Sequence, residues 1–242
     1  MTEPVKVGWV VDYPSAQLVF AAPTPVRDSR IKALSRRAVQ ACPAVNDLEF
    51  RLFEIKCPFN LRLRLESEND EHSLYSVPEG TRLDDDLINS FVTLMSPEFW
   101  RSSNHPVIQI RLPYYFVADD EVYLDQFPPF MSTVFRQWPG LLISGRFPTS
   151  LWPRSLNWAF EWHETDKDLI LRRNQPWCYI YFETKVPDRK VELVRAEQTP
   201  ELIEYRRGIS DTPKYMSNTF SLFEEAKSRR PKTLLVEKIT DD

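Results

Sequence analysis

Glycine is scarce in this sequence, with 5 residues among 242 against 20 prolines, and this balance restricts the available folds. An average chain carries roughly 7% glycine and 5% proline, so the usual ratio is inverted here. Loops that hold phosphate groups need glycine where the backbone approaches the ligand closely. Neither GxGxxG nor GxxxxGK[ST] occurs in the sequence. Dinucleotide-binding folds of the Rossmann type and P-loop folds are therefore excluded.

Cysteines and long apolar runs are also few. The three cysteines, Cys42, Cys57 and Cys178, are odd in number and show no CxxC spacing, which predicts neither a disulfide framework nor a zinc ribbon. No apolar run reaches the ~18 residues of a membrane-spanning helix. The first 20 residues carry charges within their apolar stretch, so no signal peptide is visible. We therefore expect a cytoplasmic protein with no membrane partner.

An excess of basic charge is missing as well. The chain has 31 Lys and Arg against 35 Asp and Glu, for a net charge of −4. No uniform basic field exists that could hold a phosphate backbone, so we expect no nucleic-acid partner. The basic groups at residues 30–37 and 227–232 are short and indicate solvated helix faces. A hydrophobic fraction of 42% is enough to bury a core, which indicates a soluble globular protein.

Strand-like alternation dominates the middle of the chain, and helices are predicted around it. The expected strands are residues 48–55, 61–65, 107–112, 141–147, 156–163, 169–172 and 177–182. The expected helices are residues 28–40, 84–95, 199–208 and 217–229, and the polar residues 67–80 are expected to form a loop. Many short strands with little helix between them favour an α+β, β-rich fold, with an antiparallel sandwich or jelly-roll-like core and peripheral helices.

The change in character after Pro187 predicts two parts of the chain. We expect a β-rich core domain over residues 1–187 and a C-terminal helical extension over residues 188–242. The extension is expected to dock on its own sheet or on a neighbouring copy. In the second case the protein would be a homo-oligomer through its C-terminal helices.

The richest candidate for a binding site runs from Phe127 to Trp162, where aromatic residues alternate with arginines. Indoles beside guanidinium groups can hold a planar or anionic ligand by stacking, cation-π contact and bidentate hydrogen bonds. The sequence therefore predicts a noncatalytic protein, without a cofactor, that binds a small ligand or a protein partner through a Trp/Arg-rich face. The candidate ligand residues are Arg136, Trp138, Arg146, Trp152, Arg154, Asn157 and Trp158. The alternative is that the aromatics fill the core while the arginines cover its rim.

The few histidines leave an alternative of another class. The H-x-[DE] element is absent, and the HExxH pattern that begins at His163 has Lys167 at its second ligand position. A metal site formed by His105, His163 and Glu161 remains the alternative, with a transition metal as cofactor of an enzyme of specialised metabolism. This alternative requires at least two of these side chains to converge.

Four short motifs carry a resemblance to a known family. They are Cys42-Pro43 with Asn46, the residues from Ile110 to Phe116, Leu156-Asn157-Trp158, and the residues from Gln175 to Ile180. In this order they resemble an uncharacterised domain-of-unknown-function family of bacterial and phage proteins, over about residues 23–183. The resemblance implies one compact β-rich domain and a place in a bacterial or phage assembly, and it implies no activity. It marks as positions to test Pro113, Tyr114, Asn157, Trp158 and Cys178.

Overall fold

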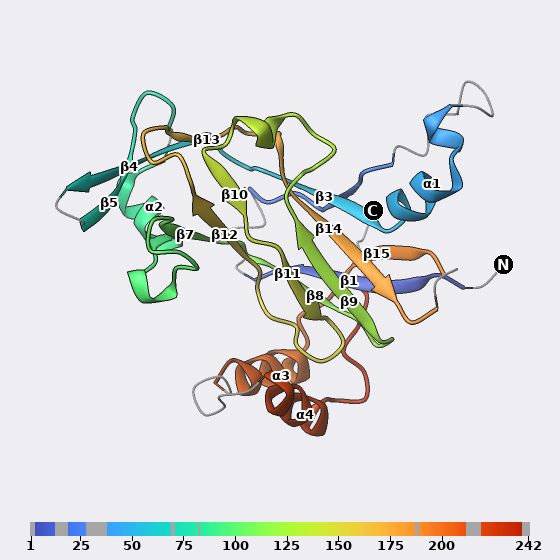
Figure 1. Ribbon diagram of the computed structural model, residues 1–242. Helices are drawn as coiled ribbons and strands as arrows, with labels where there is room; N and C mark the ends of the chain where they lie inside the picture. The colour runs from blue at the N-terminus through green and yellow to red at the C-terminus, as the bar shows by residue number, and fades with distance from the viewer. Residues whose placement is uncertain are drawn as a thin grey trace.

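Four β-sheets form the framework of the part of the chain that the structure describes (Figure 1). The structure is a computed structural model that describes residues 3–12, 19–27, 38–68, 71–81, 83–186, 189–211 and 219–238. The first sheet has the order β15 (Val191–Arg195), β1 (Val5–Val11) and β8 (Tyr114–Val117). The second has the order β10 (Gly140–Leu142), β12 (Asn157–Trp162), β7 (Val107–Arg111) and β6 (Val92–Leu94).

The other two sheets complete the β-structure. The third has the order β11 (Gly145–Pro148), β9 (Val122–Phe127), β14 (Pro176–Thr184), β3 (Leu52–Lys56) and β2 (Thr24–Pro25). The fourth has the order β13 (Leu169–Leu171), β4 (Leu61–Glu68) and β5 (Glu71–Ser76). Within these sheets the neighbouring strands are antiparallel, except that β1 and β15 are parallel.

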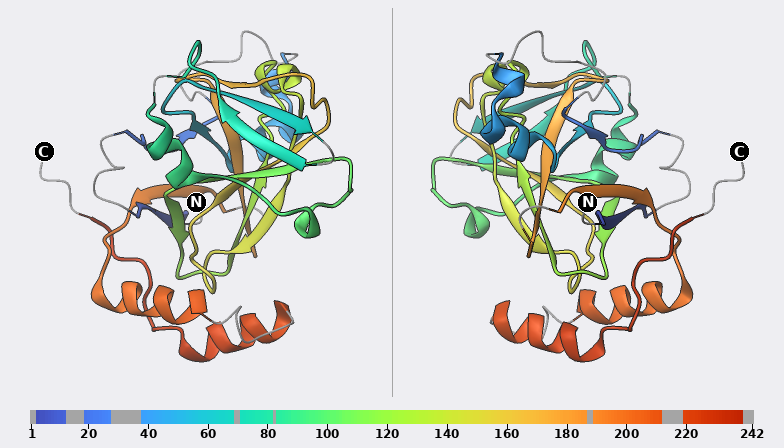
Figure 2. Two further views of the ribbon diagram at one scale, coloured as in Figure 1. Left: turned by 90° about the vertical axis from the view of Figure 1, so that its left-hand side faces the viewer. Right: turned by 90° about the vertical axis from the view of Figure 1, so that its right-hand side faces the viewer.

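The helices lie at the periphery of these sheets (Figures 1 and 2). They are α1 (Pro43–Glu49), α2 (Asp85–Phe91), α3 (Pro200–Asp211) and α4 (Thr219–Arg229), with short 3-10 turns η2 (Val39–Ala41), η3 (Pro97–Phe99) and η4 (Val134–Gln137). Asp84 caps α2 by accepting a hydrogen bond from the Asp86 amide at 2.9 Å. None of the described helices is long and apolar enough to cross a membrane. The predicted α+β, β-rich fold with peripheral helices is confirmed.

The main hydrophobic core receives side chains from all four sheets. Its largest members include the indoles of Trp158, Trp162 and Trp177, each 0% exposed. The Trp158 ring stacks on Phe160 at 5.2 Å between centroids and meets Trp138 edge-on at 5.3 Å. Its indole N–H donates to the Trp177 carbonyl at 3.1 Å, so this buried donor is satisfied. Trp138, Trp158 and Trp162, which belong to the aromatic region found in the sequence, therefore lie in the core.

The C-terminal extension docks on the protein's own first sheet. A second apolar cluster joins Leu202 and Tyr205 of α3 and Leu222 of α4 to Val10 and Tyr115 on that sheet. Figure 2 shows α3 and α4 lying together beneath the strands in both views. Strand β15 of the same extension pairs with β1, so the extension also contributes backbone hydrogen bonds to the sheet. Assembly through these helices stays a prediction.

Some predicted elements differ from the observed ones. The expected loop at residues 67–80 contains β5, which has few apolar residues and is held by its ladder with β4. The expected helix at 84–95 ends at Phe91, because the β-branched pair Val92 and Thr93 begins β6. Gly208 does not end α3, because the helix continues to Asp211. Among the described residues no glycine has the positive φ of a helix-ending glycine. The helix expected from residue 28 falls mostly outside the described residues, and Pro43 begins a helix instead of ending one.

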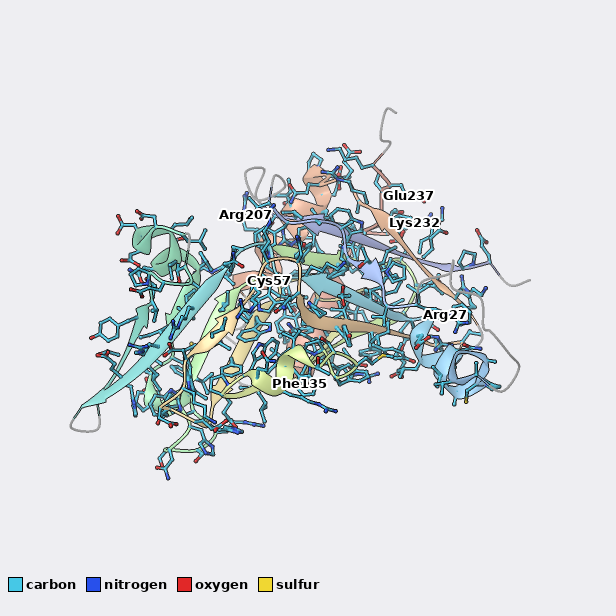
Figure 3. The ribbon with its side chains drawn as sticks, turned by 90° about the horizontal axis from the view of Figure 1, so that it is seen from above. Arg27, Cys57, Phe135, Arg207, Lys232 and Glu237 are labelled. Carbon is cyan, nitrogen blue, oxygen red and sulfur yellow. The ribbon has the colours of Figure 1, made fainter. Side chains whose placement is uncertain are left out.

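The cysteines are unpaired, as the sequence predicts. Cys57 lies in the middle of the molecule, between the strands, in Figure 3. Burial raises the pKa of Cys57 and of Cys178 to about 12, so both thiols stay protonated at neutral pH. Cys178 is therefore a small buried hydrophobe, and neither thiol is a candidate nucleophile.

Candidate metal centre

Glu161 lies near the end of β12, on the face opposite to the buried indoles. Side chains alternate along a strand, so Asn157 and Glu161 share one face while Trp158 and Trp162 point into the core. The strand therefore has one apolar face and one polar face. The Glu161 side chain is nevertheless only 6% exposed, and Arg101 and His163 lie against its carboxylate.

Strand pairing brings both histidines to this carboxylate. β12 is antiparallel to β7, and Glu161 is the register partner of Val107. His163 follows the end of β12 and His105 precedes the start of β7, so each lies two residues beyond that paired position. In an antiparallel ladder the two positions face each other. The imidazole rings accordingly lie 4.5 Å apart between centroids.

The three side chains converge on one carboxylate oxygen. Nε2 of His163 lies 2.8 Å from Oε1 of Glu161, and Nδ1 of His105 lies 4.0 Å from the same oxygen. One possible ligand atom from each of the three residues falls within 4.8 Å of the others. Among the residues that the structure describes, no other group of three His, Cys, Asp or Glu side chains meets this spacing.

Arg101 completes the cluster from the loop before β7. Its Nε donates to Oε2 of Glu161 at 2.6 Å and its Nη2 donates to Oε1 at 3.0 Å, which makes a bidentate ion pair. These hydrogen bonds, with a smaller contribution from His163, lower the pKa of Glu161 to about 2 against the opposing effect of burial. The carboxylate is therefore ionised at neutral pH.

Two imidazoles and one carboxylate form a ligand set that suits several transition metals, including Zn²⁺ and Fe²⁺. Ligand atoms bound at about 2.1 Å to one ion lie roughly 3.0–3.4 Å apart in tetrahedral or octahedral geometry. The observed 2.8 and 4.0 Å bracket this range, so small side-chain rotations would bring the ligands to an ion. A carboxylate oxygen has more than one lone pair, so Oε1 can contact Arg101 and an ion together.

The predicted Trp/Arg-rich face is distributed over several parts of the molecule. Trp138 and Trp158 contact each other in the core, where Trp138 is 6% exposed. Trp152 and Arg154 form a second pair, with the guanidinium 4.7 Å from the ring centroid. Trp152 also contacts Phe223 of α4 at 5.8 Å. The core positions of two indoles favour the alternative in which aromatic residues fill the interior.

The other three candidate ligand residues lie elsewhere. Arg146 of β11 makes ion pairs with Asp125 at 3.4 Å and with Glu183 at 2.8 Å. Arg136 is exposed on η4, and Asn157 is half-buried at the start of β12. Binding through these seven residues stays a prediction, and the contacts in the structure do not gather them at one point.

Sequence reasoning missed Arg101, which engages both oxygens of the central carboxylate. It stands between Trp100 and a short run of polar residues, and no periodic pattern marks it. The only available signal was its place four residues before His105, a spacing that has no structural meaning outside a helix.

Comparison with known proteins does not add a relative. No family model matches the chain, and no curated protein matches its sequence. The resemblance to the uncharacterised bacterial and phage family therefore stays a prediction.

Proposed function

We propose that this protein binds a divalent first-row transition-metal ion through His105, Glu161 and His163 and performs metal-assisted chemistry on a small molecule. One observation carries the proposal, namely the convergence of two imidazoles and an ionised carboxylate within 4.8 Å. The residues come from two segments more than 50 positions apart, so chain connectivity alone does not explain the convergence.

The number of protein ligands supports a reactive site over a purely structural one. Structural zinc ions have four protein ligands, whereas catalytic ions have three and leave a position for water or substrate. The side chains of His105 and His163 are 38% and 35% exposed, so solvent and small molecules can reach the cluster. The protein's contribution is to bring the two imidazoles together beside an ionised carboxylate.

Metal titration of the protein over residues 1–242 tests the site. After treatment with a chelator, we expect one Zn²⁺ per chain by calorimetry and a Co²⁺ absorption spectrum typical of nitrogen and oxygen ligands. Substituting an outer-shell residue of a metal site typically costs 10–100-fold in affinity, so loss of a ligand in His105→Gln or His163→Gln should cost about 100-fold or more. His72→Gln is the matched control, because His72 contacts Trp100 and lies outside the cluster.

The Co²⁺ spectrum also separates the two parts of the proposal. Added azide should shift the absorption bands if an exchangeable position exists. Bands that do not respond to azide would mean a closed structural site and would overturn the proposed chemistry. Equal affinity in the wild type and both ligand variants, or an equal loss in His72→Gln, would overturn the site itself and leave the cluster as a structural ion-pair network.

A further inference from the structure

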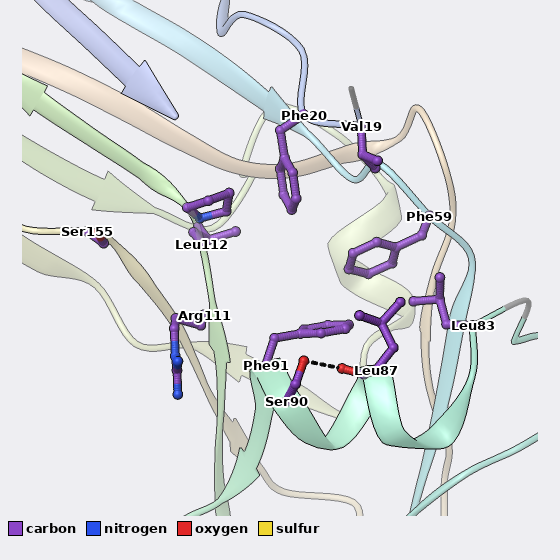
Figure 4. Close-up of a pocket in the computed structure, with 11 residues that line it drawn as sticks. Val19, Phe20, Phe59, Leu83, Leu87, Ser90, Phe91, Arg111, Leu112 and Ser155 are labelled. Atoms are coloured by element: carbon purple, nitrogen blue, oxygen red, sulfur yellow. Dashed lines mark hydrogen bonds between the residues drawn. The ribbon is translucent and has the colours of Figure 1, made fainter. Parts of the chain in front are cut away.

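A cavity of about 510 Å³ opens at the other end of β7, away from the histidines. Its walls come from the segment before β2, the turn between β3 and β4, helix α2 and the junction of β7 and β8 (Figure 4). The lining is mostly apolar, with Val19, Phe20, Phe59, Leu83, Leu87, Phe91, Leu112 and Pro113. This volume lies within the roughly 300–1,000 Å³ that is usual for small-molecule sites.

The aromatic walls of this cavity are fixed by the core behind them. Phe59 contacts Phe91 at 5.3 Å and the fully buried Trp177 at 5.6 Å. Phe20 packs edge-on against the buried Tyr114 at 5.6 Å. Figure 4 shows the Phe20, Phe59 and Phe91 side chains arranged around the hollow. A rigid apolar wall that is already formed favours a ring or chain of matching size.

The polar residues at the rim differ in whether they have partners. Ser90 donates to the Leu87 carbonyl and Ser155 donates to Asp12, each at 2.6 Å. The guanidinium of Arg111, in contrast, makes no hydrogen bond or ion pair with any residue that the structure describes. None of the described lining residues is a carboxylate, and Asp12, which lies next to Ser155, already pairs with Arg206, so the charge of Arg111 is not compensated within the described wall.

We propose that this cavity binds a small organic anion, with an apolar ring or chain among Phe20, Phe59 and Phe91 and an acidic group at Arg111. The apolar walls supply affinity by removing the body of the ligand from water. The guanidinium selects an anion, since it can donate two parallel hydrogen bonds to a carboxylate or sulfonate. This site does not depend on the metal centre, because Arg111 and His105 lie at opposite ends of β7.

Two fluorescent probes with the same ring system separate the apolar contribution from the charged one. 1-Anilinonaphthalene-8-sulfonate is anionic, and N-phenyl-1-naphthylamine lacks the sulfonate. We expect both to bind once per chain, with the anionic probe the tighter. Arg111→Gln should weaken the anionic probe about tenfold or more, because it removes both charge-assisted hydrogen bonds to the sulfonate, and should leave the neutral probe unchanged.

Two further variants make the test specific. Leu87→Trp places a larger side chain at the rim, where Leu87 is 51% exposed, and should weaken the binding of both probes. Ser90→Phe, also on an exposed position of α2, should do the same if the first variant unfolds. Arg136→Gln is the matched control, since this exposed arginine likewise has no partner among the described side chains.

Three results would overturn the proposal. They are the absence of saturable binding of either probe, an equal affinity of Arg111→Gln and the wild type for the sulfonate, and a loss of binding in Arg136→Gln. The last result would place the anion at the arginines that the sequence predicts. In the first case, binding of the neutral probe without binding of the sulfonate would reject an anionic ligand, while leaving the metal proposal untouched.

Discussion

Substituting Arg101 by Gln gives the sharpest test of how the cluster at β12 is balanced. Arg101 engages both oxygens of Glu161, at 2.6 and 3.0 Å, and would place its charge next to a bound cation. An ion about 2.1 Å from a carboxylate oxygen would lie about 5 Å from the guanidinium. The Arg101 side chain is 60% exposed, so water screens its charge. The repulsion between a divalent ion and the guanidinium is then roughly 1.5–2 kcal/mol.

This repulsion predicts that Arg101→Gln tightens Zn²⁺ binding by on the order of tenfold. The metal-free variant should also unfold at a lower temperature, because it leaves the buried Glu161 carboxylate without its main partner. Calorimetry measures the affinity, and thermal unfolding with and without Zn²⁺ measures the stability. Arg64→Gln is the matched control, since Arg64 makes a similar ion pair with Asp168, away from the cluster.

Two outcomes would refute this reasoning in different ways. A weaker Zn²⁺ affinity in Arg101→Gln would mean that the arginine orients Glu161 for the metal and does not oppose it. An unchanged Zn²⁺ affinity in Arg101→Gln would mean that Glu161 is not a ligand. Arg101 binds both oxygens of Glu161, so its removal should change the affinity of any ion bound to that carboxylate.

Three further predictions concern stability. Trp158→Ala should lower the free energy of unfolding by ~3–5 kcal/mol, because this 0% exposed indole is packed between other rings. A decrease of less than about 2 kcal/mol in a urea titration would contradict its role in the core. Hydrogen bonds from Arg64 and a second arginine lower the pKa of Asp168, so its contribution is present above the ordinary carboxyl pKa of about 3.9 and is lost as the pH falls through the lower folded pKa. Urea titrations of Asp168→Asn between pH 2 and 6 should therefore show a flatter acid limb than the wild type, and parallel curves would reject this assignment. Gly140→Ala should lower the melting temperature, because a Cβ would collide with a backbone carbonyl of β12. Gly208→Ala inside α3 should raise the free energy of unfolding by about 1 kcal/mol. A more stable Gly140→Ala and a less stable Gly208→Ala would contradict both predictions.

The alternation of apolar and polar residues predicts the strand that carries the site. Strict alternation from Leu156 to His163 predicts a strand with Trp158 on one face and Glu161 on the other, and both faces are observed. Alternation is a property of neighbouring residues, so the sequence contains it directly. The same reasoning failed for β5, where the strand is defined by its ladder with β4 and its own residues alternate weakly.

For the candidate site residues, too, the sequence indicated the residue types, whereas the tertiary structure decided their positions. His105, Glu161 and His163 could be proposed because so few histidines exist, but their convergence depends on the β7–β12 register. The Trp/Arg-rich region was detected from composition, yet composition does not distinguish a buried indole from an exposed one. Trp158 is 0% exposed, whereas Arg111, which is free of ion pairs among the described residues, lines a cavity that no pattern marked.

The sequence by itself determined the β-rich class, the absence of phosphate-binding glycine loops, and the polar and apolar faces of β12. These properties depend on composition and on residues adjacent in the chain. Only the tertiary structure decided that His105 meets His163, that Arg101 engages Glu161, and that Phe20, Phe59 and Phe91 surround one cavity. The physical reason is that strand register and packing depend on contacts between distant segments, whose combined free energy is not visible in any local window of sequence.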